Sequence, residues 1–124
     1  MKKEKYISAF LAFILWGTWA YFVNIDDSNR FVSSFFQGLA SFVITLFIVR
    51  LITIFNKIFE NNSVIITAIL TVTITSSIVF VGHLLIHTQN IFYTILPTVI
   101  VSFIFTVFMA KKVSKLTKKE NHVR

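Results

Sequence analysis

Residues 31–55 read FVSSFFQGLASFVITLFIVRLITIF, a stretch in which Arg50 is the only charged side chain. A helix needs about 20 apolar residues to cross the roughly 30 Å hydrocarbon core of a bilayer. Three further apolar stretches of similar length cover residues 6–23, 64–86 and 91–110. We therefore predict an all-α fold, a bundle of four transmembrane helices in one integral membrane domain.

The overall composition agrees with a membrane protein. Hydrophobic residues make up 56% of the 124-residue chain and charged residues 14%, which is too apolar for one soluble core. We predict a single domain over residues 1–124, ending in a basic tail over residues 111–124. Because four packed helices leave little room inside, we expect any solute path to lie between subunits of a homo-oligomer. The absence of cysteine excludes disulfides and thiolate sites.

The positive charges alternate along the chain. The N-terminal segment carries +2, the loop before residue 31 carries −1, the loop after residue 55 with its flanks carries +1, the third loop carries none and the tail carries +5. The positive-inside rule then places both termini in the cytoplasm, as expected for a multi-pass protein of the cell membrane. A cleavable signal sequence over the first stretch is the alternative.

The basic residues near the predicted inner face also suggest a lipid contact. Lys and Arg next to a membrane attract anionic headgroups by about 1 kcal/mol per charge. The residues in this position are Arg50, Lys111, Lys112 and Lys115. We predict anionic lipid, and not nucleic acid, as their partner.

Two segments of the chain resemble each other at an offset of 61 residues. Residues 40–50 and 101–111 share Ser, Phe, Thr and Phe at matching positions, and each ends in a basic residue. A duplicated two-helix unit, related by an axis along the membrane normal, is one explanation. A chance match in a chain with 15 phenylalanines is the other.

Each predicted span carries one narrow stripe of small or polar residues at four-residue spacing. The stripes are Ser8, Ala12, Trp16, Ala20 and Asn24; then Gln37, Ser41 and Thr45; then Thr67, Thr71, Thr75, Val79, His83 and His87; and finally Thr94, Thr98, Ser102 and Thr106. Such stripes let membrane helices approach closely and exchange hydrogen bonds. The same hydroxyl groups are also suited to lining a hydrated path.

Two histidines lie at the end of the third stripe, near the predicted outer end of the third span. His83 and His87 are one helical turn apart, a spacing at which two imidazoles can share a metal ion or pass a proton. The nearest carboxylates are Asp26 and Asp27, in a different loop. We interpret the histidines as packing residues and predict no metal and no cofactor, with a metal site, a proton relay or a pH sensor as alternatives.

Residues and motifs that the chain lacks also argue against several classes of function. No acidic residue lies inside any span, whereas carriers coupled to protons or cations generally place a carboxylate there. The chain has no phosphate-binding glycine loop, nucleophile-base set or HExxH motif. We predict that the protein is not an enzyme.

Two functions remain open. The first is a helix-packing or accessory subunit that associates through the stripes, either with itself or with a larger membrane partner. The second is a minimal transporter or channel for a small polar or lipid-linked solute. The candidate residues for either role are Asn24, Gln37, Ser41, Thr45, Thr71, Thr75, His83, His87, Asn90, Thr94, Thr98 and Ser102.

Four of these residues separate the two hypotheses. They are Gln37, Thr75, Thr98 and Ser102. If they meet in dry contact, the packing role is favoured. If they open onto a continuous cavity that reaches His83 and Asn24, transport is favoured.

Overall fold

The computed structural model describes the chain over residues 2–59 and 64–123, and its side chains over residues 3–59 and 64–116. These residues form four helices: α1 (Lys2–Val23), α2 (Arg30–Phe59), α3 (Val64–Leu85) and α4 (Ile91–Val123). Each helix contains a segment that is long and apolar enough to cross a membrane. The prediction of an all-helical fold with four apolar spans is therefore confirmed.

The helices extend beyond the apolar stretches. α2 continues to Phe59, and α4 continues through the basic segment to Val123. Neither extension contains glycine or proline, and lysine is a good helix former, so nothing in these segments ends a helix early. The lysines from Lys111 to Lys119 thus lie on a helix, although the side chains of Lys118 and Lys119 lie outside the described residues.

α3 ends where a left-handed residue stops it. His87 has a φ of 60°, which a residue other than glycine adopts infrequently. The amide of Thr88 donates to the carbonyl of His83 (3.0 Å), and the amide of His87 donates to that of Leu84 (3.2 Å). This pair of bonds is a Schellman motif, which satisfies the last carbonyl groups of the helix.

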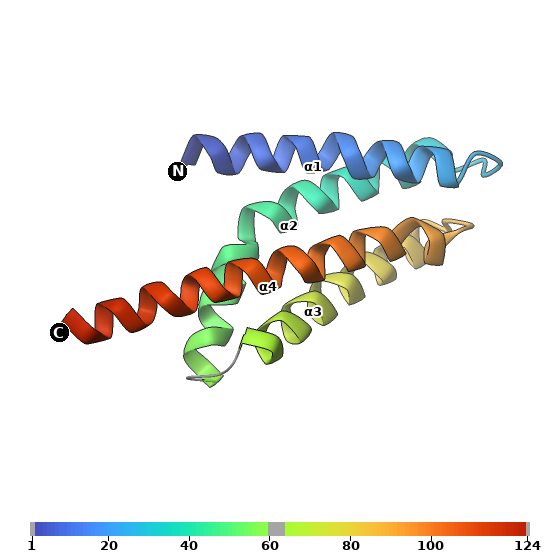
Figure 1. Cartoon of the computed structure of the whole chain (residues 1–124). Coiled ribbons are helices and arrows are strands. Elements are labelled where there is room, and N and C mark those ends of the chain that lie inside the picture. Colours follow the sequence, from blue (N-terminus) through green and yellow to red (C-terminus); the bar gives the residue numbers. More distant parts are fainter. Residues whose placement is uncertain (1, 60–63, 124) are drawn as a thin grey trace.

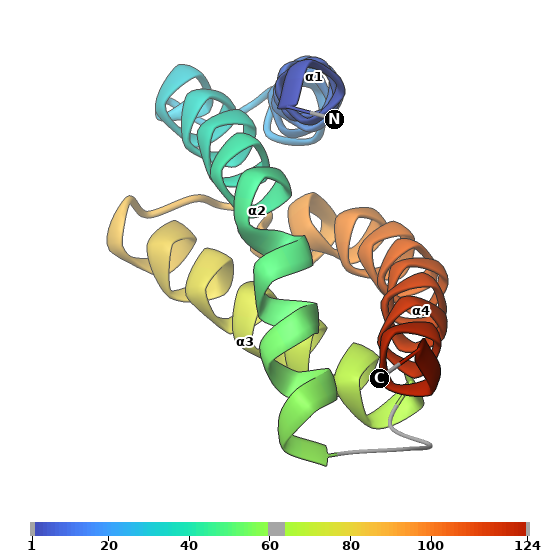
Figure 2. The same ribbon diagram turned by 90° about the vertical axis from the view of Figure 1, so that its left-hand side faces the viewer.

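The four helices run alternately up and down (Figure 1). We call the end with both chain termini the terminal end, and the end with the α1–α2 and α3–α4 loops the loop end. α2 lies centrally and contacts all three other helices, whereas no described residue of α1 approaches α3. α1 and α4 lie near each other at the loop end and diverge toward the terminal end, as Figures 1 and 2 both show.

The contact between α1 and α2 depends on two glycines. The hydroxyl of Ser34 donates to the carbonyl of Gly17 (2.6 Å), and a Cβ placed on Gly38 would lie 2.9 Å from the carbonyl oxygen of Phe13. The two backbones are therefore as close as glycine allows, which is typical of helix pairs in membranes.

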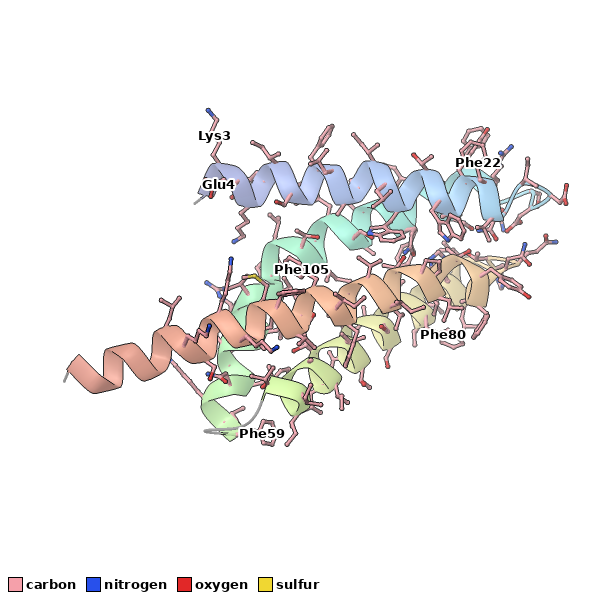
Figure 3. All side chains as sticks on the ribbon, in the orientation of Figure 1. Lys3, Glu4, Phe22, Phe59, Phe80 and Phe105 are labelled. Atoms are coloured by element: carbon pink, nitrogen blue, oxygen red, sulfur yellow. The ribbon has the colours of Figure 1, made fainter. Side chains whose placement is uncertain are left out.

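Large apolar side chains cover the outside of the bundle. Phe22 on α1, Phe59 on α2 and Phe80 on α3 are all exposed, and Figure 3 shows Phe22 pointing away from the other helices. Many buried side chains, in contrast, are polar, such as Gln37 and His83. This apolar exterior around a polar interior fits a protein whose solvent is lipid.

Candidate functional site

A chain of hydrogen bonds connects three helices near the loop end. Its members come from α2 (Ser33 and Gln37), α3 (His83), α4 (Thr98) and the α3–α4 loop (Thr88). The bond lengths are 2.7 Å between the hydroxyls of Ser33 and Thr88, 2.7 Å from Thr88 Oγ1 to His83 Nδ1, 2.7 Å from His83 Nε2 to Gln37 Oε1, and 3.1 Å from Gln37 Nε2 to Thr98 Oγ1.

The atom types give this chain a direction. The Oε1 atom of Gln37 can only accept, so His83 carries its hydrogen on Nε2 and donates it. In the neutral imidazole, Nδ1 is then the acceptor for the hydroxyl of Thr88, which in turn accepts from Ser33. The amide nitrogen of Gln37 donates to Thr98. The donor direction thus runs from the loop end inward.

The Schellman turn after α3 positions this chain. Because the turn folds the backbone back over the last helical residues, it brings Thr88 within hydrogen-bonding distance of the His83 side chain. The ring of Phe36 packs edge-on against the imidazole, with centroids 4.9 Å apart, and it occupies the space where Gly82 lacks a side chain. His83 is therefore fixed on its sides as well as at both nitrogens.

A second group of bonds ties the end of α1 to the start of α4. The side-chain amide of Asn24 donates to Thr94 Oγ1 (2.8 Å), and its oxygen accepts from the backbone amide of Asn90 (3.1 Å). Asn90 in turn donates from its side chain to the carbonyl of Val23 (3.0 Å). Trp19 adds a bond from its indole nitrogen to the carbonyl of Tyr93 (3.0 Å). The loop end is therefore cross-linked by polar groups.

Asp27 joins the two loops through backbone amides. Its Oδ1 accepts from the amide of Asn29 (2.9 Å), and its Oδ2 accepts from the amide of Gln89 (3.0 Å). The carboxylate is buried, and hydrogen bonds to a carboxylate are stronger than those between neutral groups. Asp27 is thus used to connect the hairpins and is not directed at a metal.

Below the hydrogen-bonded chain, toward the terminal end, the helices surround a partly open cavity of about 210 Å³, whose lining residues Ser8, Val101 and Phe105 are exposed. It is lined by residues of all four helices: Ser8, Ala12, Trp16, Gln37, Ser41, Ile44, Thr45, Ile48, Thr75, Ser76, Val79, Ile95, Thr98, Val99, Val101, Ser102 and Phe105. None of these side chains is charged. Phe105 lies on the part of α4 next to the middle of α2 (Figure 3).

This cavity contradicts one expectation from the sequence. We expected four packed helices to leave little internal space, and this expectation is wrong. The further expectation, that any solute path lies between subunits, stays a prediction. The divergence of α1 from α4 toward the terminal end leaves space beside α2, and Ser8 and Phe105 line the cavity from opposite helices. A cavity is therefore present within one chain.

The structure divides the twelve candidate residues into three groups. The cavity wall contains Gln37, Ser41, Thr45, Thr75, Thr98 and Ser102. The loop-end hydrogen bonds contain Asn24, His83, Asn90 and Thr94 in addition to Gln37 and Thr98. The remaining two are apart: Thr71 is buried with an unpartnered hydroxyl, and His87 is exposed after the end of α3.

Two alternative conditions follow from the sequence, dry contact between the polar stripes or a continuous cavity that reaches His83 and Asn24. The observed cavity fully satisfies neither condition. Gln37, Thr75 and Thr98 surround open space, but the cavity stops at Gln37, with His83 behind it and Asn24 outside its wall. The site is thus a cavity closed at the loop end by hydrogen-bonded side chains. The lining of this cavity does not include His83 or Asn24.

Sequence reasoning missed three members of the loop-end groups, namely Ser33, Thr88 and Asp27. Ser33 lies four residues before Gln37, so one more step along the second stripe would have included it, whereas Thr88 and Asp27 lie in loops. Their partners are set by loop geometry, which periodicity does not describe. The density of Asn, Asp, Ser and Thr in both loops was the available signal.

The chemistry of the site is that of neutral hydrogen bonding. Among the described residues, no group of three or more His, Cys, Asp or Glu side chains lies close enough together to hold a metal ion. Both ring nitrogens of His83 are hydrogen-bonded, to Thr88 and Gln37, whereas the His87 side chain is exposed. The expected headgroup contacts Arg50, Lys111, Lys112 and Lys115 are all exposed.

No family model, curated protein or solved structure matches the chain. The fold and the site described above are thus the basis for any statement of function.

Proposed function

We propose that the protein is a non-enzymatic, multi-pass membrane protein that binds a small amphipathic or lipid-linked solute in the cavity between its helices, as a minimal carrier. The observation behind this proposal is that Gln37, Thr75 and Thr98, which sit on three different helices, surround open space. Membrane helices bury polar groups at a cost, and groups left around a cavity are typical of a substrate site.

The composition of the wall indicates what kind of molecule fits. Hydroxyl and amide groups alternate with apolar side chains such as Ile44, Ile48 and Phe105. Binding sites for small molecules are mostly apolar with a few placed polar groups. At about 210 Å³ the cavity is smaller than the 300 to 1,000 Å³ typical of such sites, which favours a slender ligand.

The position of the stripes favours this role over helix packing with a partner. Most of the stripe residues with polar side chains face the interior. Four are fully buried and one almost fully, namely Thr67, Thr71, Thr94 and Thr106, and then Gln37. Residues that already face the interior offer no surface to another subunit. The stripes therefore support the bundle and the cavity more directly than they support an external interface.

A second candidate, association with another copy or a larger membrane partner, rests on a separate observation. Thr73 and Ser77 are exposed one turn apart on α3, among apolar side chains that face outward. Small polar residues at this spacing mediate contacts between membrane helices. Mass determination in mild detergent tests this candidate, because Ser77→Leu is expected to shift an oligomer to the monomer.

We also propose that both termini lie in the cytoplasm and that the basic residues of the terminal end contact anionic lipid, supported by the alternation of charge along the chain.

A duplicated two-helix unit is supported by the starts of α2 and α4, at Arg30 and Ile91, which differ by the 61 residues of the sequence match. The bonded residues Gln37 and Thr98 are also 61 apart.

The cavity is tested by filling it. Ser41→Leu adds bulk to the wall, and the matched variant Ser77→Leu adds the same bulk to the outside of α3. Native mass spectrometry of the purified proteins is expected to show a retained small molecule on the wild type and on Ser77→Leu, and a loss on Ser41→Leu. Equal retention by all three would exclude the cavity as the binding site.

A flux measurement in liposomes tests whether binding leads to transport. We expect movement of the retained molecule across the bilayer to change when His83→Ala removes the support of Gln37. A wild-type protein that binds the molecule but never moves it is a binding protein, and the carrier role is then wrong.

A further inference from the structure

We infer that the loop-end wall of the cavity is a hydrogen-bond donor site, and that the ligand is a neutral, single-chain amphiphile whose carbonyl oxygen is bound there. This inference rests on the proposed function and specifies its ligand. It follows from the juxtaposition of Gln37 and Thr98 at the closed end of the cavity.

The orientation of Gln37 decides what the wall offers to a ligand. Its Oε1 is occupied by His83 Nε2 (2.7 Å), so its amide nitrogen is turned toward Thr98 (3.1 Å). That nitrogen carries two hydrogens and the bond to Thr98 uses one. Within the described residues the second has no acceptor, although the Gln37 side chain is almost completely buried.

Thr98 contributes a second donor at the same place. Its oxygen accepts from Gln37, and among the described residues its own hydrogen is donated to no other group. A buried donor without an acceptor is destabilising, so both hydrogens favour a ligand that supplies acceptors. One carbonyl oxygen has two lone pairs and can accept from both groups.

The absence of charge in the wall selects against an ionised head. No side chain that lines the cavity is cationic. Moving a phosphate or carboxylate into such an environment is costly unless a positive group compensates it. An ester or amide carbonyl needs no such compensation, so the wall is suited to an uncharged acceptor.

The rest of the cavity is suited to a hydrocarbon chain. The wall extends along α2 from Gln37 to Ile48, which at about 1.5 Å per residue is a length of about 16 Å. Its far part contains Ile44, Val101 and Phe105 beside small hydroxyl residues. A polar group at Gln37 followed by a single apolar chain matches this order.

Trp16 provides a reporter inside the cavity wall. The chain has two tryptophans, so Trp19→Phe leaves Trp16 as the only indole. Bromine quenches indole fluorescence at short range. In nanodiscs, we expect a brominated monoacylglycerol to quench Trp16 at a concentration on the order of tenfold lower than a brominated alkane or fatty acid of the same chain length.

Variants of the donor groups test the cause of this preference. Gln37→Met keeps the length of the side chain and removes its hydrogens, and Thr98→Val removes the hydroxyl with little change in shape. Each is expected to reduce the preference for the ester, whereas Thr73→Val, the same change on the exposed side of α3, leaves it intact. If Gln37→Met fails to fold, Thr98→Val still tests whether the donor groups cause the preference for the ester.

The outcomes separate this inference from the proposed function. Equal quenching by ester and alkane, or a preference for the carboxylate, overturns the donor site but leaves the cavity as a binding site. Quenching that is identical in the wild type and in the filled variant Ser41→Leu shows that nothing enters the cavity, and the proposed function is then wrong.

His83→Phe tests the positioning role of the imidazole. Phenylalanine fills a similar space but cannot hold Gln37 Oε1, so the amide is free to rotate. We expect the ester preference to fall while quenching by the alkane stays unchanged. A variant that loses both has lost the cavity itself, and a variant that keeps the full ester preference shows that His83 does not orient Gln37.

Discussion

Asn29 and Asn90 make equivalent contacts across the loop end of the bundle. Each directly precedes a helix, and each donates from its side-chain amide to a carbonyl of the opposite hairpin, Asn29 to Ile86 (3.3 Å) and Asn90 to Val23 (3.0 Å). The two asparagines are 61 residues apart. The two hairpins thus hold each other through the residues that start their second helices.

Loss of the hydrogen bonds made by Asn24, which also join the two hairpins, is expected to loosen the loop end. Asn24→Leu would leave the amide of Asn90 without an acceptor and remove the bond to Thr94, at a cost of about 1 to 3 kcal/mol. Hydrogen exchange should increase in the α3–α4 loop and in the last turn of α1. The same substitution at Ser28, which is exposed in the α1–α2 loop, serves as the control.

The contact between α1 and α2 at Gly38 leaves no room for a side chain. Gly38→Ala places Cβ about 2.9 Å from the backbone oxygen of Phe13, and backbone cannot move aside, so we expect a loss of about 1 to 3 kcal/mol in thermal unfolding.

Gly82→Ala gives a different kind of clash, because the added Cβ meets the ring of Phe36. The double variant Gly82→Ala with Phe36→Leu should therefore recover stability. A Gly38→Ala protein as stable as the wild type would contradict the close approach of α1 and α2.

Replacement of His87 by glycine is expected to stabilise the protein. It adopts the left-handed conformation that ends α3, and glycine adopts this conformation without the penalty of about 1 to 2 kcal/mol that a side chain incurs. His87→Gly should raise the temperature of unfolding, and His83→Gly should lower it. An equal loss in both variants would mean that His87 makes a contact that outweighs its backbone cost.

The orientation in the membrane can be measured without removing any native thiol, because the chain contains no cysteine. Ser28 at the loop end and Leu116 at the terminal end are both exposed. In intact cells, an impermeant maleimide should label Ser28→Cys but label Leu116→Cys only after lysis. Labelling of both from the same side would contradict the arrangement of the four spans.

The sequence predicts the helices well because membrane spans depend on a simple quantity, the length of uncharged apolar chain. The starts of α3 and α4 agree with prediction, at Val64 and Ile91. The ends of α2 and α4 were predicted too early, since a helix continues into charged residues when nothing stops it. Periodicity also predicted that Gln37 and Thr98 face the interior.

The contacts of the site were less predictable. The pairing of His83 with Thr88 depends on a turn that reverses the chain after α3, and no stripe describes this turn. For the same reason, His83 is buried whereas His87, four residues later, is exposed. The internal cavity depends on the angle between α1 and α4, which the spacing of small residues did not reveal.

The close approach of Gly17 and Gly38 has a mechanical consequence. α1 is tied to its neighbours at the loop end by Asn24 and Trp19 and touches α2 at the two glycines, while its first turns extend away from α4. The second half of α1 is therefore held against α2 and α4 by these groups. A side chain added at Gly17 would meet the carbonyl oxygen of Ser34 and push α1 away from α2 at the point where the two backbones meet.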